Sequence, residues 1–420
     1  MMNRLLTNFL VAISCILANA AQAQTYVLAP DRVFDGETMQ EGWRVRVEDG
    51  RIAAAGPQVS ESGAEVIDLA GTTLTPGLID AHSHVLLHPY DETSWNDQVL
   101  RESVAERAAR AVNHLKATLD AGFTTLRDLG SEGAGYADVG LRQALEKGVI
   151  AGPRLIVAGP AIVATGVYGP KGFHEGVTVP KGAVEVSGVP NLIEETRRQL
   201  GGGAQWVKVY ADYGWGPTGE PRPTFSLDEL KAIVEIAKAA GAPVVAHAGL
   251  DESMRMAVEA GVETIEHGDR GSLETYRLMA KKGVAICPTL GAVEAIMRYR
   301  GWDGEAATAP GRVTDKHNQM DRILRAGTPL CNGSDVGVFD HGDNAWELEL
   351  MVEYGVAPMD ALKAATSGNA RILHLEDEIG AVRPGMTADL AAFTGDPSAD
   401  ISALHDVRFV MQGGKIVRQP

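Results

Sequence analysis

The sequence predicts an α/β protein: a (β/α)8 TIM barrel with a small β-sandwich domain formed by both chain ends. Eight short apolar runs alternate with helical patterns through the middle of the chain, and β-rich segments flank them on both sides. Residues with metal-binding side chains follow several of the apolar runs. At 420 residues, the chain can form one large domain and a small accessory one. We expect the sandwich from residues 24–75 and 376–420, and the barrel from residues 76–375.

The first 23 residues are predicted to be a secretory signal peptide. Met1–Arg4 is positively charged, Leu5–Leu17 is mostly apolar, and Ala21–Ala23 has the small-x-small pattern of a cleavage site. A membrane anchor is disfavoured because polar residues interrupt the apolar run, which is shorter than the roughly 20 residues that span a bilayer. A lipoprotein is disfavoured because the residues before Cys15 lack the usual pattern. We expect a periplasmic or secreted mature protein that starts at Gln24.

Net charge and cysteine content indicate which partners and which covalent cross-links to expect. The formal net charge of −17 would repel nucleic acid and anionic membranes, so we expect neither as a partner after signal cleavage. Cleavage leaves two cysteines, Cys287 and Cys331, in apolar runs. Because two cysteines in a large domain do not make a disulfide framework, we expect buried free thiols.

Both ends of the chain carry hairpin patterns. In the N-terminal segment, β-forming residues flank the turn Glu48–Gly50, and in the C-terminal segment the turn Gln412–Lys415 separates two further β-forming runs. Since chain termini often lie close together, we expect both segments to form one sandwich.

The middle of the chain alternates strand and helix patterns. The predicted strands are Leu78–Ala81, Thr124–Leu129, Arg154–Ala158, Trp206–Tyr210, Pro243–Ala246, Glu263–Glu266, Val284–Pro288 and Thr328–Gly333. A helix is predicted over Leu227–Ala240, where Ser226 and Glu229 match a capping box. Eight mostly apolar strands favour a parallel barrel that is buried on both faces. An open doubly wound sheet is the alternative, which the count of eight and the positions of the ligand-type residues disfavour.

Five residues that can bind metals follow four of the predicted strands. His82 and His84 follow the first strand, and the alternation of side chains along a strand puts both imidazoles on one face. His247, His267 and Asp335 each follow a later strand. Because chemistry in such barrels occurs at the carboxyl ends of the strands, these residues predict a metal site there.

Lys208 lies inside the apolar run Trp206–Tyr210, where an unpaired ammonium is costly. One interpretation is a salt bridge to a neighbouring carboxylate. The other is that burial lowers the pKa of Lys208 and the neutral amine adds CO2, which gives an anionic carbamate that can bridge two metal ions.

The order of these residues resembles that of the amidohydrolase superfamily, over nearly the whole mature chain. The strings Thr75–His84 and Gly333–Asp335 resemble its imidazolonepropionase and Xaa-Pro dipeptidase branch. The resemblance implies two divalent metal ions and a hydroxide that bridges them. Their implied ligands are His82, His84 and Asp335 for the first ion, His247 and His267 for the second, and carbamylated Lys208 as the bridge.

The resemblance also implies the chemistry and the assembly. Asp335 would act as general base toward the hydroxide and pass the proton to the leaving amine. The resemblance further implies a homo-oligomer, for example an octamer. Imidazole and carboxylate ligands make zinc the metal we expect, with manganese, cobalt and nickel as alternatives.

Substrate-binding candidates come from the predicted loops beside the metals. Three of these loops are rich in aromatic residues, which indicates either an apolar pocket for an aromatic substrate or simple loop packing. The aromatic candidates are Tyr168, Tyr210, Tyr213 and Trp215, and the polar candidates, which could hold a substrate carboxylate, are His88, Lys171, His174 and His341. The pair Arg127–Asp128 is interpreted as part of an internal structural ion pair.

One loop departs from the dipeptidase pattern. Residues 164–174 lack the Gly-Gly-His-Gly-like string of that branch and, with residues 88–97, are more similar to bacterial amidohydrolases that cleave ochratoxin A. This similarity implies a carboxypeptidase-like enzyme that releases an amino acid from an N-acyl group. A cyclic-amide or ester hydrolase on the same site is the alternative. A periplasmic solute-binding protein is disfavoured because Lys208 and Asp335 suit hydrolysis and not storage.

Overall fold

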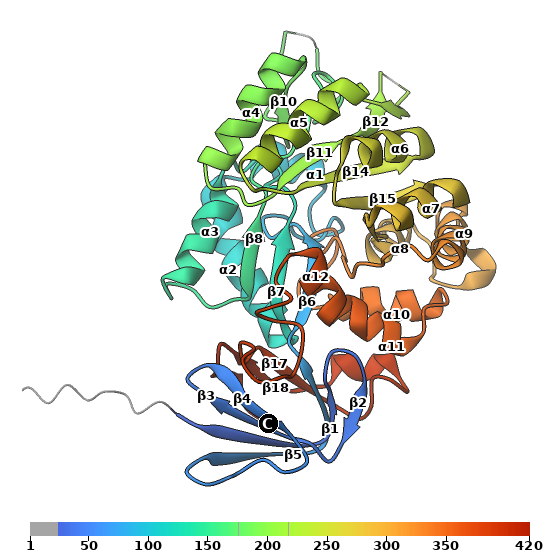
Figure 1. The fold of residues 1–420 in the computed structure, drawn as a ribbon. Helices are drawn as coiled ribbons and strands as arrows, with labels where there is room; N and C mark the ends of the chain where they lie inside the picture. The colour runs from blue at the N-terminus through green and yellow to red at the C-terminus, as the bar shows by residue number, and fades with distance from the viewer. Residues whose placement is uncertain (1–23, 175, 217) are drawn as a thin grey trace, which may run out of the picture.

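The computed structural model describes residues 24–174, 176–216 and 218–420, so the predicted signal peptide lies outside the described residues. Within these ranges, no helix combines the length and the apolar character needed to cross a membrane. A sheet built from both chain ends lies at one end of the molecule, and a larger region of parallel strands and helices extends from it (Figure 1).

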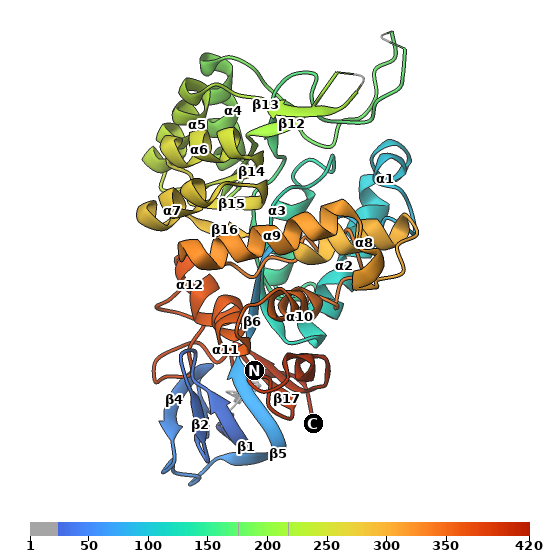
Figure 2. The ribbon, with the colours of Figure 1, turned by 90° about the vertical axis from the view of Figure 1, so that its right-hand side faces the viewer.

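The end sheet has eight hydrogen-bonded strands. They are β1 (Tyr26–Phe34), β2 (Met39–Glu41), β3 (Arg44–Glu48), β4 (Arg51–Gly56), β5 (Glu65–Pro76), β17 (Leu390–Thr394), β18 (Val407–Gln412) and β19 (Lys415–Arg418). Their order is β19-β18-β17-β5-β1-β3-β4, with β2 paired to β1. The two predicted hairpins are confirmed as β3–β4 and β18–β19. Strands from both ends thus share one continuous sheet where the sequence predicts a sandwich, and the C-terminus lies beside it (Figure 2).

Seven of the eight predicted central strands are present. They are β6 (Leu78–Ser83), β7 (Phe123–Asp128), β8 (Arg154–Val157), β11 (Val207–Tyr210), β14 (Val244–Leu250), β15 (Thr264–Arg270) and β16 (Ala285–Cys287). One parallel sheet contains β6-β7-β8, and a second has the order β10-β9-β11-β14-β15-β16, with β9 at Ile162–Val163 and β10 at Val184–Glu185.

The eighth predicted strand, Thr328–Gly333, does not form a regular strand. Leu330 makes an isolated bridge with Ile286, and Val336, beyond the predicted strand, makes one with Ser83. Between the two bridges Asp335 has a left-handed backbone, with φ of 60°, which a regular strand does not allow. We call residues 328–336 the eighth segment. These bridges connect β16 to β6, and the bond from Gln205 N to Val157 O, 2.8 Å long, connects β8 to the start of β11.

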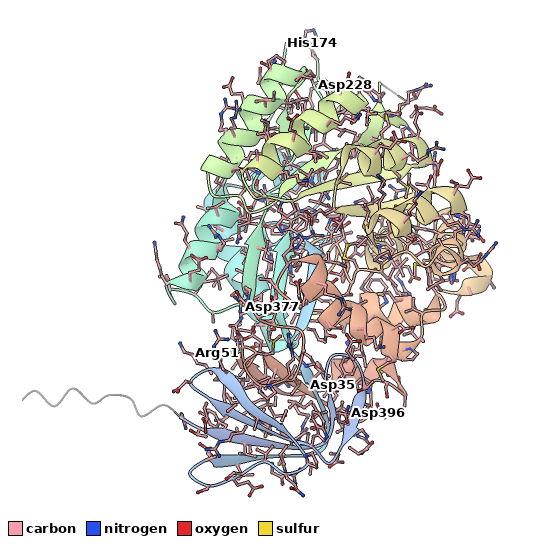
Figure 3. All side chains as sticks on the ribbon, viewed as in Figure 1. Asp35, Arg51, His174, Asp228, Asp377 and Asp396 are labelled. Atoms are coloured by element: carbon pink, nitrogen blue, oxygen red, sulfur yellow. A yellow bond between two sulfur atoms is a disulfide. The ribbon has the colours of Figure 1, made fainter. Side chains whose placement is uncertain are left out.

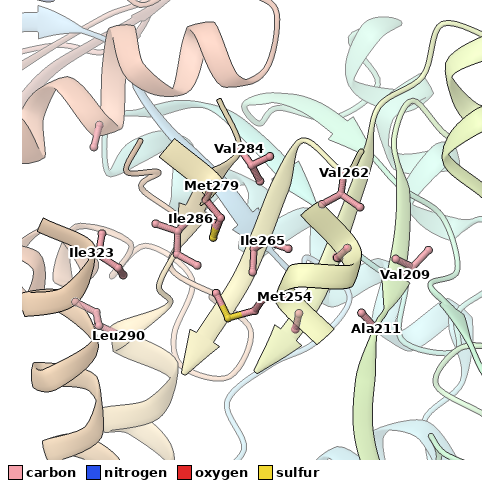
Figure 4. Close-up of a cluster of buried hydrophobic side chains, with 14 of the residues drawn as sticks. Val209, Ala211, Met254, Val262, Ile265, Met279, Val284, Ile286, Leu290 and Ile323 are labelled. Carbon is pink, nitrogen blue, oxygen red and sulfur yellow. The ribbon is translucent and has the colours of Figure 1, made fainter. Parts of the chain in front are cut away.

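Helices cover the outer faces of the central strands (Figure 2). They are α1 (Trp95–Arg101), α2 (Val104–Asp120), α3 (Ala137–Glu146), α4 (Val189–Gly201), α5 (Leu227–Ala239), α6 (Asp251–Ala260), α7 (Leu273–Lys282), α8 (Leu290–Tyr299), α9 (Gly311–Ala326), α10 (Ala345–Glu353), α11 (Pro358–Lys363) and α12 (Asn369–Ile372). The predicted capping box of Ser226 and Glu229 is present at the start of α5. Apolar side chains such as Ile265 and Met254 pack between strands and helices (Figure 4).

The two remaining cysteines form a disulfide, so the prediction of free thiols is wrong. Cys287 ends β16, and Cys331 lies on the neighbouring eighth segment, with the Cα atoms 4.6 Å apart. The bridge between Ile286 and Leu330 puts the next residue of each segment side by side. The sequence conceals this pairing because 44 positions separate the two cysteines and only the strand order makes them neighbours.

Candidate metal centre and substrate cavity

The six predicted metal ligands lie in or just after four central strands and the eighth segment. His82 is in β6 and His84 follows it, while Lys208 is in β11. In the strand register, Tyr210 of β11 pairs with His247, and Ala248 pairs with His267. Asp335 joins this group because its backbone N–H donates to His82 O at 2.8 Å.

Three of these residues form a compact donor group. Asp335 Oδ1 lies 3.5 Å from His82 Nε2 and 3.3 Å from His84 Nε2, and the possible ligand atoms of the three lie within 4.8 Å of one another. His82 Nε2 is buried and has no hydrogen-bond partner among the described residues. A buried imidazole nitrogen without a partner, beside a carboxylate, fits a divalent metal ion.

His247 and His267 lie next to this group. Their ring centroids are 4.5 Å apart, and the His267 ring lies 5.2 Å from the His82 ring. His267 Nδ1 lies 4.0 Å from Asp335 Oδ2. The two histidines therefore lie beside the compact donor group and are further candidate ligands.

Lys208 is 1% exposed, and its Nζ lies 5.6 Å from the centre of the Tyr210 ring. Among the residues that the structure describes, no carboxylate oxygen lies within the 4.0 Å of a salt bridge to Lys208. Burial lowers the pKa of Lys208 to about 8, against the opposing charges of Glu266 and Asp335. A lysine with this pKa has an appreciable neutral fraction near neutral pH, as carbamate formation requires.

The charge states of the candidate ligands differ: in the metal-free protein His247, His267 and the Asp335 carboxylate are ready to bind a cation, and His84 must first lose a proton. Burial lowers the pKa of His247 to about 3 and that of His267 well below its usual value, so both rings are neutral. Burial opposes the charged form of His84, but its hydrogen bond to Asp335 raises the pKa of His84 to about 9. Although burial also disfavours the carboxylate, His82 and His84 lower the pKa of Asp335 to about 2.

A second layer of contacts orients the ligands. His82 Nδ1 lies 2.6 Å from Glu266 Oε2, and the other oxygen of Glu266 accepts hydrogen bonds from Arg127 at 3.2 Å and Thr264 at 2.6 Å. His84 Nδ1 donates to a backbone carbonyl at 3.0 Å. Such partners fix the ring orientation of metal-binding histidines. Arg127 does form an internal ion pair, with Glu266 as its partner.

Four of the six candidate ligands, His84, His247, His267 and Asp335, line a cavity of about 580 Å³, and His82 and Lys208 are not among its lining residues. Its wall includes Tyr90, Tyr168, Tyr210 and Tyr213, and the Tyr168 ring centroid lies 4.9 Å from those of both Tyr210 and Tyr213. The hairpin of β12 (Asp212–Trp215) and β13 (Glu220–Pro223) supplies part of the wall. The cavity combines a cluster of histidines and carboxylates with an aromatic wall.

Residues 73–417 match the Amidohydrolase family. The chain belongs to the amidohydrolase family. It is 29% identical to the ochratoxinase of Aspergillus niger over 83% of this chain and 76% of that protein. It is 26% identical to the imidazolonepropionase of Geobacillus thermodenitrificans over 96% of each chain. A solved structure of a Xaa-Pro dipeptidase with bound methionine in the active site superposes with a TM-score of 0.84, at 29% identity over 94% of this chain and 100% of that one. This amidohydrolase is therefore a hydrolase of C–N bonds.

The other predicted substrate contacts of the amidohydrolase lie outside the cavity wall. His88 is buried beside Glu102, 2.9 Å from its Oε1, and His341 contacts Leu87 O at 3.0 Å. Lys171 donates to Gly214 O at 2.9 Å, and Trp215 is 38% exposed. His174 lies at the end of the molecule opposite the end sheet (Figure 3).

The cavity of this amidohydrolase also includes charged residues that the sequence analysis does not single out. They are Glu132, Asp212, Asp269, Arg270 and Arg312. Glu132, Asp212 and Arg270 follow or end central strands, so the position rule that identified the histidines would have pointed to them. Arg312 gives no such signal, because it lies on α9 and reaches the cavity only through the packing of α9 against β15.

Proposed function

We propose that this amidohydrolase uses two divalent metal ions to hydrolyse the amide bond of N-acyl amino acids or dipeptide-like substrates, with ochratoxin A as a candidate. The observation that carries the proposal is one group of side chains at the cavity. His84, His247, His267 and Asp335 line it, His82 belongs to the compact donor group, and the buried Lys208 lies close enough to lower the pKa of His247. We infer that the two parallel sheets form one (β/α)8 barrel, since hydrogen bonds connect them on both sides.

The donor set supports a division of ligands. His82, His84 and Asp335 would hold one ion, His247 and His267 the other, and Lys208 would bridge the two as a carbamate. Zinc suits these ligands. Two bound divalent ions would lower the pKa of a water molecule and polarise the substrate carbonyl.

Asp335 is the general base in this proposal. Burial raises its pKa, but the charges of His82 and His84 outweigh that effect and lower it to about 2, so Asp335 is ionised at neutral pH. Its carboxylate can take a proton from the attacking water and deliver it to the leaving amine. Glu266 contacts Nδ1 of the His82 ring, and this contact would keep the opposite nitrogen, Nε2, directed at the site.

The cavity wall supports a substrate that has aromatic or apolar parts and a free carboxylate. The tyrosines and the apolar residues of α8, including Val293 and Ile296, would contact the apolar parts. Arg270 and Arg312 are the basic side chains on the described wall, so we propose them as partners of the carboxylate in place of Lys171, His174 and His341. We also propose that the enzyme is exported and forms a homo-oligomer.

A matched pair of substrates tests the proposed function. Converting an N-aroyl-phenylalanine to its C-terminal amide should lower kcat/KM by about tenfold or more, because the basic side chain that binds the substrate carboxylate would lose its partner. The measurement is turnover of both compounds by the zinc-loaded enzyme. Equal rates would contradict the carboxypeptidase-like proposal.

The similarity to an imidazolonepropionase supports the second candidate, a cyclic-amide or ester hydrolase. Faster opening of a cyclic imide or a lactone than of either N-aroyl compound would favour it.

A further inference from the structure

Glu132 occupies a special position on the cavity wall. It follows β7, is 2% exposed and has a left-handed backbone with φ of 48°. Such a backbone is strained for a residue with a side chain, so surrounding contacts must hold it. Arg107 provides two of them, donating to the backbone carbonyls of Ser131 at 3.3 Å and Glu132 at 2.8 Å.

The two carboxylate oxygens of Glu132 have different surroundings. Oε2 accepts hydrogen bonds from Trp95 Nε1 at 2.9 Å and from the Tyr168 hydroxyl at 2.6 Å. Oε1 lies 3.9 Å from His84 Nδ1, which instead donates to Gly130 O at 3.0 Å. From the residues in ranges 24–174, 176–216 and 218–420, Oε1 accepts no hydrogen bond. One oxygen therefore fixes the side chain and the other is available at the cavity.

Oε1 has room for a cation closer than His84: within the described chain its one ion-pair contact is His84 Nδ1 at 3.9 Å, and that nitrogen donates to Gly130 O. A buried carboxylate is unfavourable unless a cation or hydrogen-bond donors compensate it. The guanidinium of Arg107 bonds to backbone carbonyls and forms no salt bridge with this carboxylate within the described chain. Tyr168 bonds to Glu132, and the rings of Tyr210 and Tyr213 lie against the Tyr168 ring, so the neighbourhood is aromatic, and aromatic rings attract cations.

We propose that Glu132 Oε1 binds the protonated amine of the substrate and determines specificity for it. This inference rests on the proposed function and narrows it. Glu132 follows β7, whereas Arg270 and Arg312 belong to β15 and α9, and β8, β11 and β14 lie between them in the strand order. A substrate with an ammonium group on its acyl part and a carboxylate on its amine part could contact Glu132 with the first group and Arg270 or Arg312 with the second. Unblocked dipeptides have this chemistry, and N-blocked amino acids do not.

Two compounds that differ only in the amine test the subsite. Alanyl-phenylalanine and propionyl-phenylalanine share the scissile amide and the carboxylate, but only the first has an ammonium group. The wild-type enzyme should have a kcat/KM at least tenfold higher for alanyl-phenylalanine. Glu132→Gln keeps an acceptor for Trp95 and Tyr168, and should reduce this ratio to about one. A role of Glu132 in structure alone would lower both rates and leave the ratio unchanged.

Measuring the binding of compounds that cannot be hydrolysed tests the Glu132 subsite independently of the proposed hydrolytic function. Ketomethylene isosteres of the two compounds cannot be hydrolysed, and calorimetry gives the ratio of their dissociation constants. A preference for the ammonium compound in the wild type that Glu132→Gln removes would support the subsite even if neither amide is hydrolysed. Glu102→Gln, which changes a buried carboxyl outside the cavity, is the control and should keep the preference. An equal preference in the wild type and Glu132→Gln, or none in the wild type, would overturn the proposal.

Discussion

Four residues on the cavity wall hold a left-handed backbone although they are not glycines: Glu132, His267, Thr289 and Asp335. Six non-glycine residues of the described chain have positive φ, so most of this local strain lies at the candidate site. Strained positions persist when surrounding contacts hold them, and they are typical of functional sites. At His267, the contact of Nδ1 with Thr289 Oγ1 at 2.7 Å ties two of these residues together.

The sequence predicts the histidines, Lys208 and Asp335 because strand-end position and residue type are both visible in it. The orienting contacts are not visible in this way. Glu266 is predicted only as part of a strand, and its contact with His82 depends on β15 and β6 facing each other inside the protein. Lys171 and His341 show a similar limit of sequence reasoning. Each bonds to the backbone carbonyl of a wall residue, Gly214 and Leu87, and is not itself among the lining residues, because sequence position does not fix which way a loop side chain points.

Lys208 is the residue whose replacement tests the bridge. Lys208→Ala should lower activity at least about 100-fold, because the carbamate would be lost, and short carboxylic acids should restore part of the activity by taking its place. The measurement is turnover with and without added acetate or propionate. Lys231→Ala, an exposed change on α5, is the control and should have little effect. Full activity of Lys208→Ala without added acid would contradict a bridging role.

At the scale of elements, periodicity identifies seven of the central strands and the capped helix α5, because each pattern is local. The end sheet is harder to predict. β5 pairs in parallel with β1, and it pairs in antiparallel orientation with β17, which lies more than 300 residues further along the sequence. The disulfide belongs to the same class of long-range feature, because it requires β16 and the eighth segment to be neighbours.

The Cys287–Cys331 bond fastens β16 to the segment that carries Asp335. Two backbone hydrogen bonds also join this segment to β16, Ile286 N to Pro329 O and Cys331 N to Ile286 O, and the covalent bond adds to them a constraint that remains in the unfolded chain. The double variant Cys287→Ala/Cys331→Ala should lose about 2–4 kcal/mol in free energy of unfolding. Denaturant titration of the oxidised protein measures this. Equal stability of the two proteins, with two free thiols found in the denatured wild type, would refute the prediction.

At the scale of the whole molecule, the candidate ligands come from β6, β11, β14, β15 and the eighth segment. Metal ions held by ligands from so many strands would connect most of the central region. A ligand that binds only the folded state stabilises it in proportion to its affinity, by about 4 kcal/mol at 1,000 times the dissociation constant. Zinc should therefore raise the unfolding temperature of the metal-free wild type.

This stabilisation should increase with pH. In the metal-free protein the hydrogen bond to Asp335 raises the pKa of His84 to about 9, despite the opposing effect of burial, so its ring carries a proton at neutral pH. A metal ion can bind this ring only after the proton leaves. Metal affinity should therefore rise by up to tenfold per pH unit between about pH 6.5 and 9, which is worth about 1.4 kcal/mol per unit.

Thermal unfolding with and without zinc at pH 6.5 and pH 8.5 measures the effect. The metal-induced rise in unfolding temperature should be larger at pH 8.5, and calorimetry at pH 7 should detect protons released as zinc binds. His82→Ala should show little rise at either pH, because it removes the buried nitrogen of the compact donor group. A rise that is the same at both pH values would mean that no protonated ligand has to be displaced, and the assignment of His84 to the first ion would then be wrong.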